Sequence, residues 1–147
     1  WDPNSAENNV QMMLRMRSKA IKNFPAQIRP TQIFVPSMTF PQRHPDREIV
    51  NRILDQPNCI NTTAHFHAQK GKVPLTTTLE SFGKYRFGVS PFGHGLDCHR
   101  TWEMLWMGMI PIVRSSSLDP LYQNLPVIIV KNYTDLCEAG YLEGAYE

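Results

Sequence analysis

The stretch YRFGVSPFGHGLDCHRTWEMLWMGMIPIVR, residues 85–114, joins a strand pattern, a glycine turn, a helix pattern and a second strand pattern. Phe87 and Val89 alternate with other residues ahead of the turn, and residues 96–107 carry apolar side chains at helical spacing. The run 109–114 is apolar again. Because neighbouring parallel strands need a crossover between them, this order predicts a strand–helix–strand unit in a parallel sheet.

The same alternation extends over most of the chain. Helix patterns cover residues 9–24, 44–58, 74–85, 96–107 and a region near 117–124, with a last helix from about Thr134. Strand patterns cover residues 32–37, a short segment around Cys59, and residues 85–91, 109–114 and 125–131. The sequence therefore predicts one α/β domain over residues 1–147, Rossmann-like, with a mainly parallel sheet and helices on both faces. The unbroken apolar run PVIIV (126–130) fits a strand that is buried on both faces.

Composition narrows the class of protein. The chain has 147 residues, is 41% hydrophobic and carries a net charge of +2, and its basic residues form no block. We therefore expect no nucleic-acid partner. No apolar run approaches the roughly 20 residues that span a bilayer, and the start has no signal-peptide pattern. Since the first residue is Trp1, a longer parent protein, with an anchor or partner domain outside this chain, stays open.

Cysteine and asparagine patterns bear on the compartment. Cys59, Cys98 and Cys137 lie far apart without a C-x-x-C pair, so neither a zinc knuckle nor a redox motif is indicated, and at least one thiol stays unpaired within the chain. Asn61 and Asn132 each begin an N-x-[ST] sequon, which would be an acceptor in a secretory lumen. The compartment stays undetermined, with a slight preference for a lumen such as the Golgi.

The glycine turn is the first candidate site. Gly93 and Gly95 allow positive φ and a close approach of a ligand to the main chain, and the helix that follows offers N–H groups and a partial positive charge. Phosphate suits such a position. His94, between the glycines, can donate a hydrogen bond to it. The alternative is that both glycines only form a tight turn.

The helix after the turn carries two further candidates. Its apolar stripe, expected to pack on the sheet, is formed by Trp102, Leu105, Trp106 and Met109. Arg100 and Glu103 lie off that stripe, so Arg100 can reach an anion at the helix start and Glu103 can bind a diol such as ribose. The alternative is a surface ion pair worth about 0.2–0.5 kcal/mol.

Residues 84–131 carry a more specific pattern. The segments GLDCHRTWE (95–103) and GMIPIV (108–113), followed by a Pro-containing helix and a strand, resemble the nucleotide-sugar-binding region of exostosin-like inverting glycosyltransferases. The resemblance covers about a third of the chain. It implies one half of a GT-B fold, with its active site in a cleft completed by a second Rossmann-like domain or subunit.

The resemblance also implies roles for single residues. Gly93, His94 and Gly95 would face the donor diphosphate, Arg100 would neutralise it, and Glu103 would bind the ribose hydroxyls. Ser115 and Ser116 would lie in a neighbouring loop on the donor side. The expected ligands are a nucleotide-sugar donor and a glycan or protein acceptor, with no cofactor and no metal ion. The catalytic base is not identified.

Several alternatives stay open at this point. The rival function is a non-catalytic nucleotide- or carbohydrate-binding module, or a structural subunit, on the same fold. His65 and His67 near Cys59 allow a metal site, although two loop histidines are more often ordinary polar surface. Asp97 is expected to cap the helix that follows it.

Overall fold

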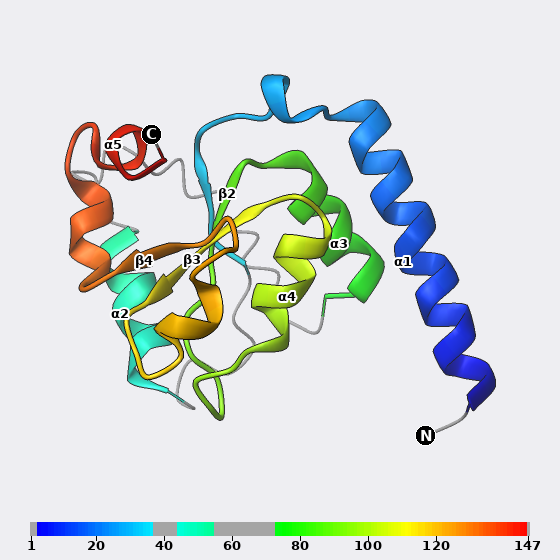
Figure 1. The fold of residues 1–147 in the computed structure, drawn as a ribbon, viewed down its shortest axis with the longest axis horizontal. Coiled ribbons are helices and arrows are strands. Elements are labelled where there is room, and N and C mark those ends of the chain that lie inside the picture. The colour runs from blue at the N-terminus through cyan, green and yellow to red at the C-terminus, as the bar shows by residue number, and fades with distance from the viewer. Residues whose placement is uncertain (1–2, 37–43, 55–72, 147) are drawn as a thin grey trace.

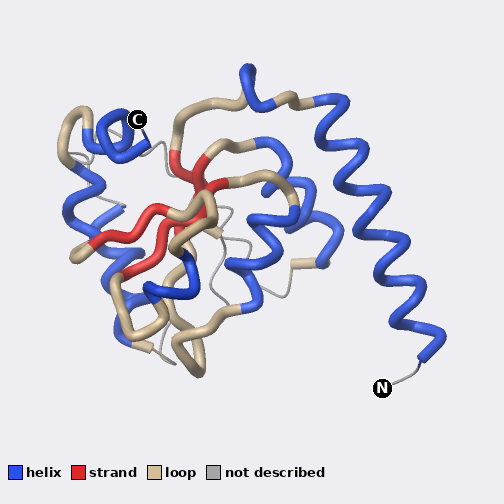
Figure 2. The backbone as a smooth tube through the Cα atoms, viewed as in Figure 1, coloured by secondary structure: helices blue, strands red, loops and turns tan. Residues whose placement is uncertain are grey.

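The computed structural model describes residues 3–36, 44–54 and 73–146, and within them the strands form one parallel sheet. The strands are β1 (Ile33–Phe34), β2 (Phe87–Val89), β3 (Ile110–Arg114) and β4 (Ile128–Val130). Their order in the sheet is β1-β2-β3-β4, and all three pairings are parallel. Figure 2 shows the strands in red between the helices. This confirms the predicted parallel α/β fold, while the expected strand around Cys59 lies outside the described residues.

Helices cover both faces of the sheet (Figure 1). On one face lie α1 (Pro3–Asn23), α3 (Leu75–Lys84) and α4 (His99–Trp106), with α1 outermost and packed on α3. On the other lie α2 (Pro45–Leu54), the 3-10 helix η4 (Tyr133–Cys137) and α5 (Tyr141–Tyr146). Two further 3-10 helices are η1 (Ala26–Ile28) and η3 (Asp119–Tyr122). The last helix expected from about Thr134 is thus a 3-10 turn and a short α-helix.

The hydrophobic core is divided by the sheet because successive strand side chains point to opposite faces. Ile33 and Val35 belong to the cluster under α2 and η4, whereas Phe34 between them belongs to the cluster under α3 and α4. Gly88 lies against Met104 and Met109 and leaves no room for a Cβ. A glycine in β2 therefore lets α4 pack closely on the sheet.

The packing face of α4 differs from the prediction. Thr101 and Met104 are buried, whereas Trp102 and Trp106 are 37% and 36% exposed. Helical spacing alone allowed either stripe, since Thr101, Met104 and Met107 follow the same period. Flexible methionine side chains fit the close contact over Gly88 better than an indole does.

The apolar face of α1 is also narrower than predicted. Ala20 is buried and Met13 and Met16 pack against the core, but Val10 and Ile21 are 56% and 54% exposed. The cause is that α1 rests mainly on one other helix, α3 (Figure 1).

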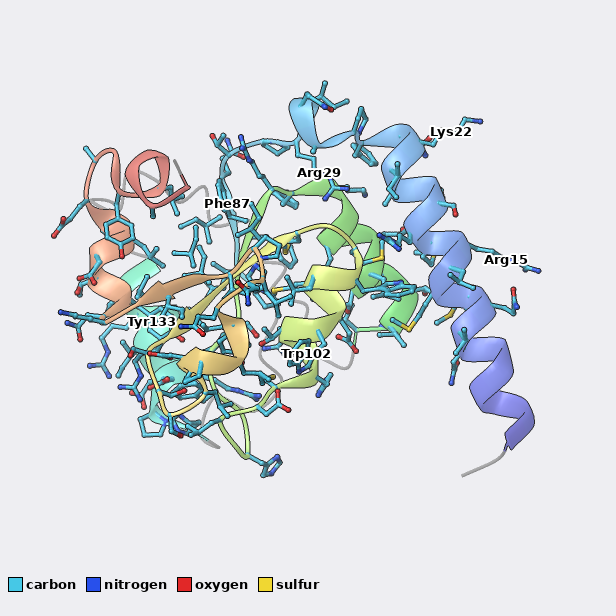
Figure 3. The ribbon with its side chains drawn as sticks, viewed as in Figure 1. Arg15, Lys22, Arg29, Phe87, Trp102 and Tyr133 are labelled. Atoms are coloured by element: carbon cyan, nitrogen blue, oxygen red, sulfur yellow. The ribbon has the colours of Figure 1, made fainter. Side chains whose placement is uncertain are left out.

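Arg29, after α1, connects this helix to the end of α4 (Figure 3). Its guanidinium donates to the carbonyl oxygens of Phe24 at 2.8 Å, Met107 at 3.2 Å and Gly108 at 2.6 Å. Gly108 has a φ of 73°, which a glycine adopts without strain. Burial lowers the pKa of Arg29 from its usual value, and the three carbonyl groups satisfy the buried cation.

Candidate functional site

The carboxyl ends of the strands gather most of the polar groups described below. Because all four strands are parallel, the segments that follow them meet at one edge of the sheet. Arg47 of α2 reaches Phe92 after β2, and Asp46 of α2 reaches Arg114 at the end of β3. Ligands of open parallel sheets bind at this edge.

The glycine turn after β2 is closed by its own hydrogen bonds. Ser90 donates its N–H to Ile112 O at 2.9 Å and so extends the β2–β3 pairing, and its hydroxyl lies 2.9 Å from that of Thr101 on α4. The Gly93 N–H donates to Gly95 O at 3.2 Å. This N–H is therefore engaged within the turn, whereas His94 and Gly95 at its tip are exposed.

The two glycines of the turn do not have the predicted positive φ. Among the described residues, only Gly108 and Gly140 have it. Gly93 matters for another reason: a Cβ there would lie 2.9 Å from Nη2 of Arg47. Gly95 has open space around it. The missing side chain of Gly93 thus makes room for a guanidinium rather than for an unusual backbone.

Arg47 faces the turn, and Arg100 lies near Arg47. Arg47 donates from Nε to Phe92 O at 3.0 Å, and it lies close enough to Arg100 of α4 to affect its pKa. The pKa of Arg100 is lowered first by burial and further by Arg47, while Cys98 and Glu103 oppose that shift. Nη1 of Arg100 is buried and has no hydrogen-bond partner within the described part of the chain. This edge therefore holds a guanidinium that is only partly satisfied.

Glu103 lies one turn further along α4, partly buried and next to Arg100. Burial raises its pKa above the usual value, and the neighbouring His99 and Arg100 act in the opposite direction. It is not among the buried residues Thr101 and Met104 of α4, whereas the sequence placed it relative to a different stripe, that of Trp102 and Trp106. The carboxylate can accept hydrogen bonds from hydroxyl groups beside the arginines.

A second cluster at the same edge was not predicted. Asp46, 1% exposed, pairs with Arg114 at 2.9 Å between Oδ1 and Nη2. The N–H of Asp46 donates to Nδ1 of His44 at 3.2 Å, so this ring nitrogen is an acceptor. The guanidinium of Arg114 also stacks 5.3 Å from the ring centroid of Phe92. We call Asp46, Arg114 and Tyr133 the paired cluster.

Tyr133 at the start of η4 completes the paired cluster (Figure 3). Burial raises the pKa of its phenol strongly, Asp46 raises it further, and Arg114 acts in the opposite direction. The sequence signal for this cluster was weak, because each member follows a different strand and only the sheet brings them together.

Ser115 and Ser116 follow β3, as expected, but their hydroxyl groups bind within their own loop. Ser115 donates its hydroxyl to Asp119 Oδ2 at 2.6 Å, and the Ser116 N–H donates to Asp119 Oδ1 at 2.8 Å. The Ser116 hydroxyl accepts the N–H of Leu118 at 3.1 Å. Both serines therefore shape the β3–η3 loop.

Asp97 does not cap α4, which corrects the prediction. The N-cap of α4 is Cys98, without a side-chain cap bond, because the helix begins at His99 rather than Leu96. Asp97 Oδ1 instead accepts the indole N–H of Trp102 at 2.8 Å. The pair fixes Trp102 at the surface, where its ring centroid lies 6.2 Å from that of Tyr122.

Other features lie away from this edge or give no site. A groove of about 250 Å³ between α1 and α3 is mostly apolar, and Lys19 and Glu80 pair beside it at 3.2 Å. The described ranges contain no group of three His, Cys, Asp or Glu side chains that could hold a metal ion. His65, His67 and Cys59 lie outside them. None of the described helices is both long and apolar enough to cross a membrane.

Comparison with known proteins identifies no family for this chain. No protein-family model matches the chain, and no curated protein matches it.

Proposed function

We propose that the turn after β2, together with Arg47, Arg100 and Glu103, binds the nucleoside diphosphate of a nucleotide-sugar donor, and that the chain is the donor-binding half of an exostosin-like inverting glycosyltransferase. The observation that carries the proposal is the buried Nη1 of Arg100, which lacks a partner among the described residues and lies near a second guanidinium. Two neighbouring cations repel each other, and an anion between them removes that cost.

A diphosphate fits the chemistry of the arginines. A guanidinium binds phosphate oxygens through two parallel hydrogen bonds, and Arg47 reaches the turn because Gly93 has no side chain. Glu103 lies beside Arg100, and its carboxylate can accept hydrogen bonds from the hydroxyls of a ribose attached to that diphosphate. The resemblance of residues 95–103 to glycosyltransferases assigns the same two roles to Arg100 and Glu103.

The proposed reaction is a displacement at the anomeric carbon of the donor sugar. The acceptor oxygen forms a bond to that carbon, the bond between the carbon and the diphosphate oxygen breaks, and the acceptor proton passes to a base. The leaving nucleoside diphosphate takes the electron pair and is stabilised by Arg47 and Arg100. The base and the acceptor site belong to a second Rossmann-like domain or subunit that closes the cleft.

Thermal unfolding with UDP, GDP and their sugars tests the proposal. A ligand at 100 times its dissociation constant stabilises the folded state by about 2.7 kcal/mol, so one nucleotide should raise Tm clearly. No stabilisation by any of them contradicts the proposal. Binding without release of nucleoside diphosphate, even when the acceptor-side domain is added, favours the non-catalytic binding module.

A further inference from the structure

We propose that Asn132 is an N-linked glycosylation site. Asn132-Tyr133-Thr134 is an N-x-[ST] sequon at the carboxyl end of β4, and Asn132 and Thr134 are both exposed, while Tyr133 between them is buried. A glycan acceptor needs an asparagine side chain in water and a hydroxyl residue two positions on. The fold supplies both, and the proposed donor site uses neither.

The conformation of Asn132 is compatible with a permanent substituent. Its backbone is extended, with φ −134° and ψ 144°, and it forms a capping box with Asp135. In that box the Asn132 side chain accepts the N–H of Asp135, and the Asp135 carboxylate accepts the N–H of Asn132 at 3.2 Å. The accepting atom is Oδ1, so a sugar on Nδ2 leaves the cap intact.

The modification is a balanced group transfer on that nitrogen. Nδ2 of Asn132 forms a bond to the anomeric carbon of an oligosaccharide carried on a polyprenyl diphosphate. The bond between this carbon and the diphosphate oxygen breaks, the polyprenyl diphosphate leaves with the electron pair, and one amide proton is released. The side chain keeps one N–H and its carbonyl oxygen.

The cysteines point to the compartment in which this transfer takes place. Cys137, in the same 3-10 helix as the sequon, is disulfide-bonded, whereas Cys98 is a buried free thiol. Disulfides persist in oxidising compartments such as the secretory lumen, where N-glycans are also attached. The disulfide and the sequon are independent features of the chain, and they agree.

Asn132 and the glycine turn lie at the same carboxyl edge of the sheet but follow different strands. β4 lies two places from β2 in the sheet, which is about 10 Å at the usual spacing between strands. The glycan would start beyond the last strand of this order, next to exposed Lys131. The glycan is detected on the peptide and nucleotide binding by thermal unfolding, so this inference and the proposed function can fail separately.

The experiment uses the full chain with Thr63→Ala, which removes the sequon at Asn61. It is expressed through the secretory pathway of cultured animal cells and, in parallel, translated in vitro with microsomes. We expect one glycan per chain, released by N-glycosidase, and conversion of Asn132 to aspartate with ¹⁸O from labelled water in the peptide mass spectrum. Thr134→Ala should abolish the glycan, and Thr134→Ser should retain it.

The threonine variants are matched because neither changes Asn132 or its cap. Unmodified Asn132 in both systems overturns the proposal, and so does a glycan that persists in the Thr134→Ala chain. The microsome reaction reports on glycosylation even if a variant fails to leave the cell.

Discussion

Two groups of charges share the carboxyl edge of the sheet, and they differ in how they are neutralised. In the paired cluster, the buried Asp46 carboxylate lies 2.9 Å from Arg114, so the charges balance within the protein, although Asp46 Oδ2, Arg114 Nε and the Tyr133 hydroxyl are also buried without a hydrogen-bond partner in the described part of the chain. At the glycine turn, Arg47 and Arg100 lie near each other, and Nη1 of Arg100 is buried without a described partner. The first group pairs opposite charges, whereas the second places two cations near each other and is the site that we propose for an anion.

The largest expected effect is loss of stability on breaking the paired cluster. Asp46→Ala leaves Arg114 without its carboxylate next to buried Tyr133, and because Arg114 is 39% exposed, we expect a cost at the low end for such pairs, about 2–3 kcal/mol. Urea unfolding measures it. The matched control is Glu48→Ala on the same helix, whose exposed pair with Arg52 should contribute less than about 0.5 kcal/mol. Equal losses of unfolding free energy in both variants would show that the Asp46–Arg114 pair has no special structural role.

Arg100→Gln should act on binding rather than on stability. It removes a charged donor to the diphosphate, so we expect nucleotide affinity to fall roughly tenfold to a hundredfold, or about 1.5–3 kcal/mol. Unfolding free energy should not fall, since a buried and incompletely paired cation is lost. Calorimetric titration with the preferred nucleotide, with Arg52→Gln as control, gives the comparison. A large stability loss with unchanged affinity would place Arg100 among the structural charges.

Substitutions of the two turn glycines should have a smaller effect on nucleotide affinity, and they separate the contribution of Arg47. Gly93→Ala places a methyl group against Nη2 of Arg47, which moves the flexible guanidinium and should weaken nucleotide binding several-fold. Gly95→Ala meets no atom within 4 Å and requires no positive φ, so binding should stay as it is. Titration of the two variants decides the point. Equal affinities would mean that Arg47 does not contact the ligand.

Substitution of Glu103 should have the smallest effect on stability, and that effect should depend on pH. Its pKa is raised in the folded state, so the folded protein holds the proton more tightly than the unfolded chain, and stability is lost as pH rises above the unfolded pKa of about 4.3. Glu103→Gln should therefore raise Tm slightly at pH 7, with no gain at pH 3.5. Glu103→Ala should weaken nucleotide binding and leave the fold intact. Unchanged affinity in Glu103→Ala would remove this residue from the site.

The fold and part of the site followed from local patterns. The strand at residues 85–91, the turn and the helix were predicted from alternation, glycine and helical spacing, all of which are properties of neighbouring residues. The choice between the Trp102 stripe and the Met104 stripe on α4 was wrong, because both have the same period. Only contact with Gly88 of β2 distinguishes them.

The sequence by itself determined the parallel α/β order and the position of the glycine turn ahead of a helix. It did not determine the packing face of that helix, so Arg100, expected off the packing stripe, lies one turn before Met104 on the buried side. The tertiary structure alone decided that Arg47 lies against Gly93, and that Asp46, Arg114 and Tyr133 form one buried cluster. These residues lie at the end of, or after, four different strands, and no local period connects them. They meet because parallel pairing brings the carboxyl ends of the strands to one edge.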